Sequence, residues 1–274
     1  MKIKTGMDLE KTLFCGQFFR TQVLGRGYLV YFKDQRIWVG QGDGWIEVQG
    51  QVARQDLEDF FDLNRDYQAV EKALASHEFL QPALEAASGI HILRQDLWEV
   101  VVSFIISANS NIPRIRKSLF ALCQNYGDQK QDQWGTYYSF PRPQDLAGVC
   151  REDFWEKIKL GYRDQYLVKT TQQVLEGQVD LEALKEVTDK DLAMKELTRL
   201  SGVGPKVAHC ILLFGLHNWQ GFPVDVWMKR ALKEHFPKIP EKDYETLAKD
   251  LFGSYAGYAQ QALFYHAKLN QVGG

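Results

Sequence analysis

The most constraining feature of this chain is an apolar helix, a glycine turn and a second apolar helix in direct succession. The first apolar run ends at Ser201, the turn 202–204 follows, and Pro205 suits the first position of the next helix, which should end near Gly215. Because glycine tolerates positive φ and has no Cβ, such a turn can approach a bulky anion closely. The unpaired N–H groups at the helix start then favour a phosphate.

Two potentially reactive side chains open successive helices at this turn. Lys206 lies in the first turn of the second helix, and Asp225 follows Pro223 and Val224 at the start of a third helix. A bare Gly-Val-Gly turn is equally typical of an ordinary helical hairpin. A lysine and an aspartate are nevertheless the residue types of an amine nucleophile and its electrostatic partner. We therefore predict a hairpin near 195–215 and a second site segment at 223–230.

Composition and charge restrict the class of protein. With 274 residues and 45% hydrophobic content, the chain can bury a substantial core in one or two domains. Its formal net charge of −2 lacks the basic excess that is common in DNA-binding proteins. Cations nevertheless cluster at 114–117 and 157–169, and acids at 56–62 and 180–191. This distribution fits a mixed surface with one basic face, and it equally fits solvated charged faces of helices.

Cysteine and histidine spacing gives no sign of a metal site. Cys15, Cys123, Cys150 and Cys210 are far apart and form no C-x-x-C pair, which argues against a disulfide framework or a zinc knuckle. We therefore expect no metal and no cofactor. The sequence shows no secretory signal and no apolar run approaching the roughly 20 residues of a membrane span. We expect a cytoplasmic, nucleoid-associated monomer without membrane contact.

The periodicity of apolar residues changes once along the chain. Between residues 12 and 52, short β-favouring runs alternate with glycine-containing turns, which predicts an antiparallel sheet of about four strands with one solvated face. From Asp56 onward apolar residues recur at helical spacing, and beyond about Ile90 nearly everything is predicted helical, with one helix capped by Asp96. The predicted class is α+β, with a small N-terminal antiparallel sheet domain and flanking helices at 1–93 and a larger all-helical domain at 94–274.

The motif L-x-G-V-G-x-K-x-A followed by P-V-D resembles the helix-hairpin-helix and Gly/Pro-Asp signature of DNA base-excision glycosylases. Within that superfamily, K-V-A-x-C-I and P-V-D-V-x-M are similar to segments of the 8-oxoguanine DNA glycosylase/lyases. The resemblance spans residues 16–264 with gaps and is most specific over 103–264. It implies backbone phosphate contacts at Gly202, Gly204 and Val207, a catalytic Asp225 and, as in the bifunctional members, a catalytic Lys206.

The segment S-F-I-I-S-A-N-S-N-I-P-R resembles the loop that this subfamily inserts into the duplex. The resemblance implies that Asn109 fills the vacated space, that Arg114 and Arg163 contact the edge of the orphaned cytosine, and that Tyr162 wedges beside it. Extruding a base costs a few kcal/mol, so the hole has to be filled, and these side chains offer suitable donors and acceptors. Taken alone, residues 109–111 are more typical of polar capping residues at a helix C-terminus.

Two further segments resemble the part of the family that binds the extruded base. Y-A-G-Y-A-Q-x-A-L-F is similar to its C-terminal helix, which implies that Cys210 and Phe264 flank the base and that Gln260 binds its edge. Without the resemblance, Cys210 and Phe264 are equally compatible with ordinary core positions. C-G-Q-F-F-R is similar to G-Q-x-F-R, which implies that the Gly16 carbonyl accepts N7–H of 8-oxoguanine. Normal guanine has an acceptor at N7 and would be repelled.

Three positions depart from the pattern of the animal enzymes. His209 replaces an acid, Ser110 replaces an asparagine, and Trp227 replaces a histidine near the phosphates. The indole N–H of Trp227 is still a donor. The departures at His209 and Ser110 leave the predicted chemistry unchanged.

The resemblance implies a bifunctional glycosylase/lyase that excises 8-oxoguanine opposite cytosine. Lys206 would attack C1′ and form a Schiff base that leads to β-elimination, while Asp225 would stabilise the developing positive charge. The expected partner is double-stranded DNA containing oxidised guanine. Three alternatives remain. An alkylpurine glycosylase of the same superfamily usually lacks the hairpin lysine, and adenine-mismatch or pyrimidine-damage glycosylases often carry an iron–sulfur loop, for which this sequence has no cysteine beyond Cys210. A non-catalytic helix-hairpin-helix DNA-binding module needs neither Asp225 nor a base pocket.

Overall fold

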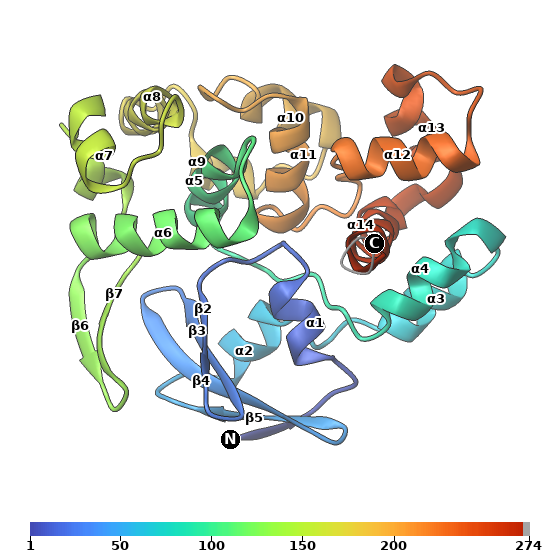
Figure 1. Cartoon of the computed structure of the whole chain (residues 1–274), viewed down its shortest axis with the longest axis horizontal. Helices are drawn as coiled ribbons and strands as arrows, with labels where there is room; N and C mark the ends of the chain where they lie inside the picture. The colour runs from blue at the N-terminus through green and yellow to red at the C-terminus, as the bar shows by residue number, and fades with distance from the viewer. Residues whose placement is uncertain (271–274) are drawn as a thin grey trace.

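The N-terminal part of the chain, drawn in blue in Figure 1, folds into an antiparallel five-stranded sheet with strand order β1-β5-β4-β3-β2. This computed structural model describes residues 1–270. The strands are β1 (Lys2–Lys4), β2 (Thr21–Leu24), β3 (Gly27–Phe32), β4 (Gln35–Gly42) and β5 (Trp45–Gln49). The last four lie within the predicted β region. The short β1 and the helix α1 (Leu9–Phe14) were not predicted, because each is too short for a periodic signal.

One face of the sheet forms its own hydrophobic core. Alternate residues of β4 and β5, among them Ile37 and Val48, are buried there together with Leu13 of α1 and Leu57 of α2 (Arg54–Phe60). Burying one face of an antiparallel sheet against helices is the arrangement that the alternating pattern predicts. The prediction of an N-terminal antiparallel sheet with flanking helices is confirmed.

Helices make up most of the remaining chain, as predicted. They are α3 (Tyr67–Leu74), α4 (Gln81–Ala87), α5 (Leu97–Ser107), α6 (Ile112–Tyr126), α7 (Arg151–Lys157), α8 (Arg163–Leu175), α9 (Leu181–Lys185), α10 (Lys190–Leu197), α11 (Pro205–Phe214), α12 (Val226–His235), α13 (Tyr244–Phe252) and α14 (Ala256–Leu269), with short 3-10 helices at Glu78–Leu80, Pro143–Leu146, Glu241–Asp243 and Gly253–Tyr255. Asp96 caps α5 as predicted, accepting the N–H of Glu99. Within residues 1–270, no helix has both the length and the apolar character needed to cross a membrane.

A two-stranded hairpin interrupts the helices. Its strands, β6 (Gln129–Asp132) and β7 (Gly135–Tyr138), lie in the region beyond Ile90 that was predicted to be almost entirely helical. The residues of β6 are all polar, so they give no alternation of apolar and polar positions. Arg36 of β4 binds the Asp132 carboxylate through two nitrogens, so this hairpin is tied to the N-terminal sheet.

The two hydrophobic cores do not divide at residue 93. Residues of α3 and α4 belong to the core of the helical part rather than to that of the sheet, and α4 packs against α14 (Figure 1). Leu93, in contrast, packs in the sheet core. The helices that follow the sheet therefore complete the helical core, and the boundary between 1–93 and 94–274 stays a prediction.

Two buried histidines lie where the sheet region meets the helical part. His91 stacks on Tyr67 with ring centroids 3.9 Å apart, and its Nδ1 lies 2.9 Å from the carbonyl oxygen of Phe61. His217 places Nε2 3.0 Å from the Ile92 carbonyl oxygen and 3.6 Å from the Asp62 carboxylate. Burial lowers the pKa of each histidine to about 4, although Asp62 opposes the shift.

We expect the protein to lose stability as the pH falls from about 6.5 towards about 4. An unfolded histidine takes up a proton near pH 6.5, whereas the folded state holds both rings neutral, so protons bind preferentially to the unfolded chain in this window. The loss for the pair is on the order of several kcal/mol at the lower limit. Urea unfolding of wild type and of a His91→Gln, His217→Gln variant at several pH values measures it. An equally steep pH dependence in the variant would contradict this assignment.

Candidate active site

The predicted hairpin joins α10 and α11 through residues 198–204. Gly202 has a φ of +82°, and a Cβ there would lie 2.7 Å from the side chain of Tyr166. Both its backbone conformation and its neighbour therefore require glycine. A Cβ on Gly204 would meet no atom within 4 Å. Gly204 thus borders open space at the start of α11, while Gly202 is packed against α8.

The first turn of α11 has amides that no side chain caps. Gly204 occupies the N-cap position without a side chain, and Pro205 has no N–H. The amides of Lys206 and Val207 therefore point out of the helix at the positive end of its dipole. This is the local arrangement that favours binding of a phosphate.

The structure brings Lys206 and Asp225 to a common neighbour, Cys210. Cys210 lies one helical turn after Lys206 and is buried. Burial raises the pKa of the Cys210 thiol, the Lys206 ammonium lowers it, and the Asp225 carboxylate raises it. Both charged groups therefore lie within electrostatic range of one buried thiol, and we call Lys206, Cys210 and Asp225 the Cys210 cluster. The Lys206 ammonium also lies 5.5 Å from the ring centroid of Phe104.

Asp225 is held by the helix that it opens. It is the N-cap of α12, and its Oδ1 accepts the N–H of Met228 at 2.9 Å. An N-cap hydrogen bond fixes the carboxylate relative to the helix axis. Asp225 thus opens its helix as predicted, and its side chain is half-buried in the same cluster as Lys206 and Cys210.

The predicted base-binding residues on α14 approach the N-terminal segment. Gly16 has a φ of +96°, and a Cβ there would lie 3.1 Å from the ring of Phe264. Gln260, one turn before Phe264, is 4% exposed, and its Oε1 has no hydrogen-bond partner among the described residues. A buried acceptor without a partner is unusual in proteins. It suits a site that receives a donor from a ligand.

Two α14 side chains that were not predicted hold the backbone next to Gly16. Gln261 donates its Nε2–H to the Cys15 carbonyl at 3.1 Å, and Lys268 donates to the Phe14 carbonyl at 3.0 Å. The two residues of the first contact are 246 positions apart in the sequence, and those of the second are 254 positions apart. No periodic pattern marks such a pair, so the sequence carried no signal for them.

The loop between α5 and α6 carries the residues predicted to face the opposite strand. Asn109 is exposed and has a φ of +49°, which is uncommon outside glycine. Asn111 accepts the N–H of Arg114 at 3.0 Å and so caps the start of α6, whereas the predicted capping was at the end of the preceding helix, where Ala108 is the C-cap of α5. Arg114 itself is exposed at the start of α6. The loop therefore presents Asn109 and Arg114 outward.

Arg163 and Tyr162 converge on the same loop from the start of α8. Arg163 is 5% exposed, and its guanidinium donates to the carbonyls of Ala108, Asn109 and Leu160. The Tyr162 hydroxyl, on an exposed ring, donates to the Ala108 carbonyl at 3.2 Å. Arg163 thus holds the backbone of Asn109, a contact that was not predicted from the sequence.

Helix α8 connects this loop to the hairpin. Further along α8, Thr170 donates its hydroxyl to the Ser201 carbonyl at 2.7 Å, and Gln173 accepts the N–H of Ser201 at 2.8 Å. With Tyr166 packed on Gly202, one helix contacts both predicted DNA-contacting segments. Their relative position is therefore fixed by α8.

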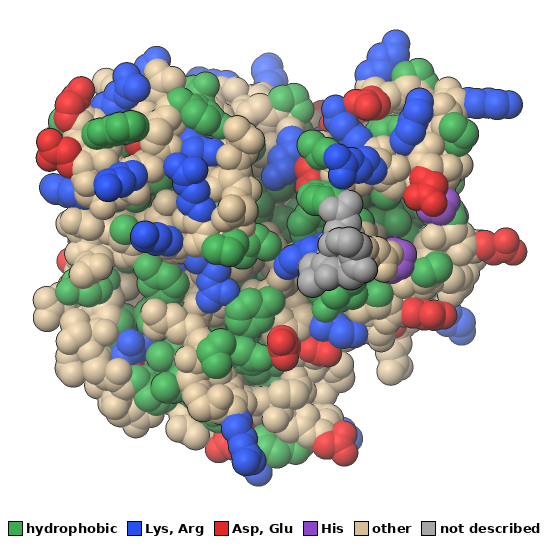
Figure 2. Space-filling view, viewed as in Figure 1, with side chains coloured by type: hydrophobic (Ala, Val, Ile, Leu, Met, Phe, Trp, Pro, Cys, Tyr) green, Lys and Arg blue, Asp and Glu red, His purple; other side chains and the backbone are tan. Residues whose placement is uncertain are grey.

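Basic side chains are spread over the helical part of the face drawn in Figure 2, whereas acidic side chains gather more towards its edges. Among the predicted basic clusters, Arg114, Lys117, Lys157, Lys159 and Lys169 are exposed. Arg116 is half-buried and binds Thr21 through its guanidinium. A protein with a net charge of −2 can thus present cations locally.

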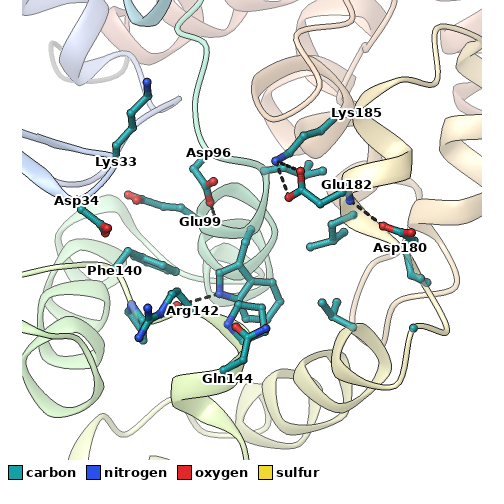
Figure 3. A pocket seen from close by; sticks show the side chains of 18 of the residues that line it. Lys33, Asp34, Asp96, Glu99, Phe140, Arg142, Gln144, Asp180, Glu182 and Lys185 are labelled. Atoms are coloured by element: carbon teal, nitrogen blue, oxygen red, sulfur yellow. Dashed lines mark hydrogen bonds and ion pairs between the residues drawn. The ribbon is translucent and has the colours of Figure 1, made fainter. Parts of the chain in front are cut away.

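A cavity of about 730 Å³ lies outside the cluster of Lys206, Cys210 and Asp225 (Figure 3). It is lined by residues at the first turn of α5, including Trp98 and Glu99, and by the loop with Phe140 and Arg142. Its lining contains none of the predicted site residues. Within residues 1–270, no group of three or more His, Cys, Asp or Glu side chains is arranged to hold a metal ion.

Sequence comparison places the chain among base-excision repair proteins. Residues 1–101 match the N-terminal domain of 8-oxoguanine DNA glycosylase, and residues 102–253 match the HhH-GPD superfamily of base excision DNA repair proteins. A probable N-glycosylase/DNA lyase from Methanothermobacter thermautotrophicus is 30% identical over 245 residues, which cover 82% of this chain and 78% of that protein.

Two solved structures share the fold over almost the whole chain. The 8-oxoguanine glycosylase/lyase of Clostridium acetobutylicum, in complex with double-stranded DNA containing cytosine opposite 8-oxoguanine, has a TM-score of 0.92 at 32% identity, with 97% of this chain and 93% of that chain covered. MBOgg1 in complex with a low-affinity DNA ligand has a TM-score of 0.93 at 30% identity, with 100% and 96% covered. The chain therefore belongs to the HhH-GPD superfamily of base-excision DNA repair proteins, as an N-glycosylase/DNA lyase with the N-terminal domain of the 8-oxoguanine DNA glycosylases.

Proposed function

We propose that this enzyme excises 8-oxoguanine paired with cytosine from double-stranded DNA and then cleaves the damaged strand. The observation that carries the proposal is the cluster of Lys206, Cys210 and Asp225 beside the uncapped amides of α11. A phosphate gripped at those amides brings a sugar close to an amine and a carboxylate. The enzyme acts as a monomer on DNA of the nucleoid and uses no cofactor.

In the excision step, the Lys206 amine forms a bond to C1′ of the extruded nucleotide while the bond from C1′ to N9 breaks. The bonding pair leaves with the base, which takes up a proton. Positive charge develops on the sugar as the base departs, and the Asp225 carboxylate stabilises it. Attack requires the unprotonated amine, which a desolvated site at the positive end of a helix favours.

In the strand-cleavage step, the sugar ring opens and the nitrogen of Lys206 is joined to C1′ as a Schiff base. The iminium withdraws electrons and acidifies the protons on C2′. Removal of one C2′ proton forms a double bond to C3′ and expels the 3′ phosphate. Water then hydrolyses the imine and restores the free amine. This sequence is the ordinary chemistry of an amine nucleophile at an aldehyde carbon.

Recognition of the base is assigned to residues around Gly16. The Gly16 carbonyl accepts N7–H of 8-oxoguanine and repels the N7 lone pair of guanine. Gln260 supplies its partnerless Oε1 to the base edge. Cys210 and Phe264 enclose the two faces of the ring. The 3.1 Å approach between a Gly16 Cβ position and Phe264 supports a shared pocket.

Recognition of cytosine is assigned to the loop between α5 and α6 and to the start of α8. Asn109 fills the space that the base leaves, Arg114 and Arg163 donate to the cytosine edge, and Tyr162 wedges beside it. The exposure of Asn109 and Arg114 supports this assignment. Because Arg163 also binds the Asn109 carbonyl, cytosine contact and loop position are coupled.

A panel of duplexes tests the proposed function. We expect a covalent complex in sodium borohydride on a duplex with 8-oxoguanine opposite cytosine. Excision opposite adenine should be slower by about tenfold or more, the effect of losing one good edge contact. Excision of alkylated purines without excision of 8-oxoguanine would instead indicate an alkylpurine glycosylase. Binding without trapping or excision would indicate a DNA-binding module.

A further inference from the structure

His209 is a completely buried polar residue on the helix that carries Lys206. Its side chain is 0% exposed, and it lies three residues after Lys206 and directly before Cys210. The proposed reaction gives it no role. A buried imidazole usually makes hydrogen bonds to nearby groups, so the partners of His209 indicate what its side chain does.

The two ring nitrogens of His209 face two different segments. Nδ1 accepts the backbone N–H of Phe222 at 3.1 Å. Nε2 lies 3.0 Å from Oε2 of Glu245 on α13, although it makes no well-aligned hydrogen bond there. A nitrogen that accepts a hydrogen bond carries no proton, so the partners assign the proton to Nε2, facing the carboxylate.

Phe222, whose backbone N–H binds His209, is the first residue of the short segment that leads to Asp225. Because the ring of Pro223 fixes its φ, the position of Phe222 restricts the positions of the residues that follow. The Phe222 N–H donates to His209, whereas the N–H groups of Val224 and Asp225 make no hydrogen bond among the described residues. The preceding Gly221 is pressed against α11, where a Cβ would lie 2.9 Å from the His209 carbonyl oxygen.

We propose that His209 is a positioning residue that fixes Asp225 relative to Lys206 through the bond from the Phe222 amide to Nδ1. Lys206 and His209 share α11, whereas Asp225 opens a separate helix after a loop. His209 is therefore a direct link between the helix of the amine and the segment of the carboxylate. The proposal rests on the proposed function, since it takes these two groups as the reacting pair.

Two substitutions separate the roles of the ring nitrogens. His209→Asn places an amide oxygen near the position of Nδ1 and keeps an acceptor for the Phe222 amide. His209→Gln reaches towards Glu245 but removes that acceptor. Both variants lose the ring, so the comparison between them cancels the common packing loss. A difference between them reports on the Phe222 contact.

We expect His209→Gln to lower the single-turnover excision rate on 8-oxoguanine by about 10- to 100-fold, the scale of a misplacement of about 1 Å. His209→Asn should recover most of this loss. Affinity for a duplex with a tetrahydrofuran abasic analogue should change by less than about threefold in both, since the phosphate contacts remain. Rates are normalised to the folded fraction measured by circular dichroism.

Tyr244→Phe is the matched control on α13. The Tyr244 hydroxyl is buried and has no hydrogen-bond partner within residues 1–270, so its removal should leave rate and affinity unchanged. Equal loss of excision in the Asn and Gln variants, or a loss of affinity that accounts for the slower rate, overturns the positioning role. Wild-type protein that excises no 8-oxoguanine contradicts the proposed function instead.

Discussion

Lys206→Gln is expected to lower single-turnover excision of 8-oxoguanine by on the order of 10³-fold or more and to abolish covalent trapping in borohydride. The amide nitrogen of glutamine is not nucleophilic, so neither the bond to C1′ nor the Schiff base can form. Losses of this size are typical when the nucleophile of a covalent mechanism is removed. Denaturing gels of end-labelled duplex measure both excision and trapping.

Lys195→Gln is the matched control for the loss of one positive charge. Lys195 lies on α10, the other helix of the hairpin, and is exposed. This variant should trap and excise like wild type. Trapping of the Lys206→Gln variant at the wild-type level would show that another amine forms the Schiff base, and the proposed mechanism would be wrong.

Local signals predicted the parts of the fold that local interactions determine. The glycine turn, the proline at the first position of α11 and the end of that helix at Gly215 all follow from backbone preferences within a few residues. The same holds for the caps supplied by Asp96 and Asp225, which bind amides three residues further along. These caps are why the positions of α5 and α12 were predictable.

The contacts that shape the site join residues far apart in the chain and were not predictable. Gln261 binds the Cys15 carbonyl across 246 positions, and Arg163 binds the Asn109 carbonyl across 54. A side chain that binds a distant backbone carbonyl leaves no periodic trace in its own helix. The tight packing of Gly202 on Tyr166 is of the same kind. The sequence therefore offered a hypothesis for the residues that approach DNA, but it carried no signal for the contacts that hold them in place.

The two hairpin glycines show this difference within one turn. The sequence suggested the same role for both, a close approach of the backbone to phosphate. In the structure, Gly202 is required by its positive φ and by Tyr166, whereas Gly204 faces open space. Gly204, at the start of α11, has the open surroundings that an approaching phosphate needs. The contact assigned to Gly202 stays a prediction and would be made by its amide alone.

Asp225→Asn is expected to lower single-turnover excision by about 10²- to 10³-fold, the effect of removing one electrostatic group that stabilises a developing charge. Asparagine has nearly the same shape and is as good an N-cap residue as aspartate. The bond to the Met228 N–H is therefore retained, and the substitution removes the charge alone. Thermal stability should change little.

Binding separates this electrostatic role from a structural one. Loss of a negative charge near DNA should leave the affinity for a duplex with a tetrahydrofuran abasic analogue unchanged or slightly higher. Fluorescence anisotropy measures that affinity, and a large loss of binding or of stability in the variant would mean that Asp225 acts through the fold.

Asp189→Asn is the matched control, since Asp189 caps α10 by accepting the N–H of Leu192 at 2.7 Å. It makes the same chemical change at another N-cap and should keep full excision. Asp225→Ala completes the comparison, because it removes both charge and cap. It should lose about 1 kcal/mol of stability but excise no more slowly than Asp225→Asn. A much slower Ala variant would show that the cap, rather than the charge, carries the effect.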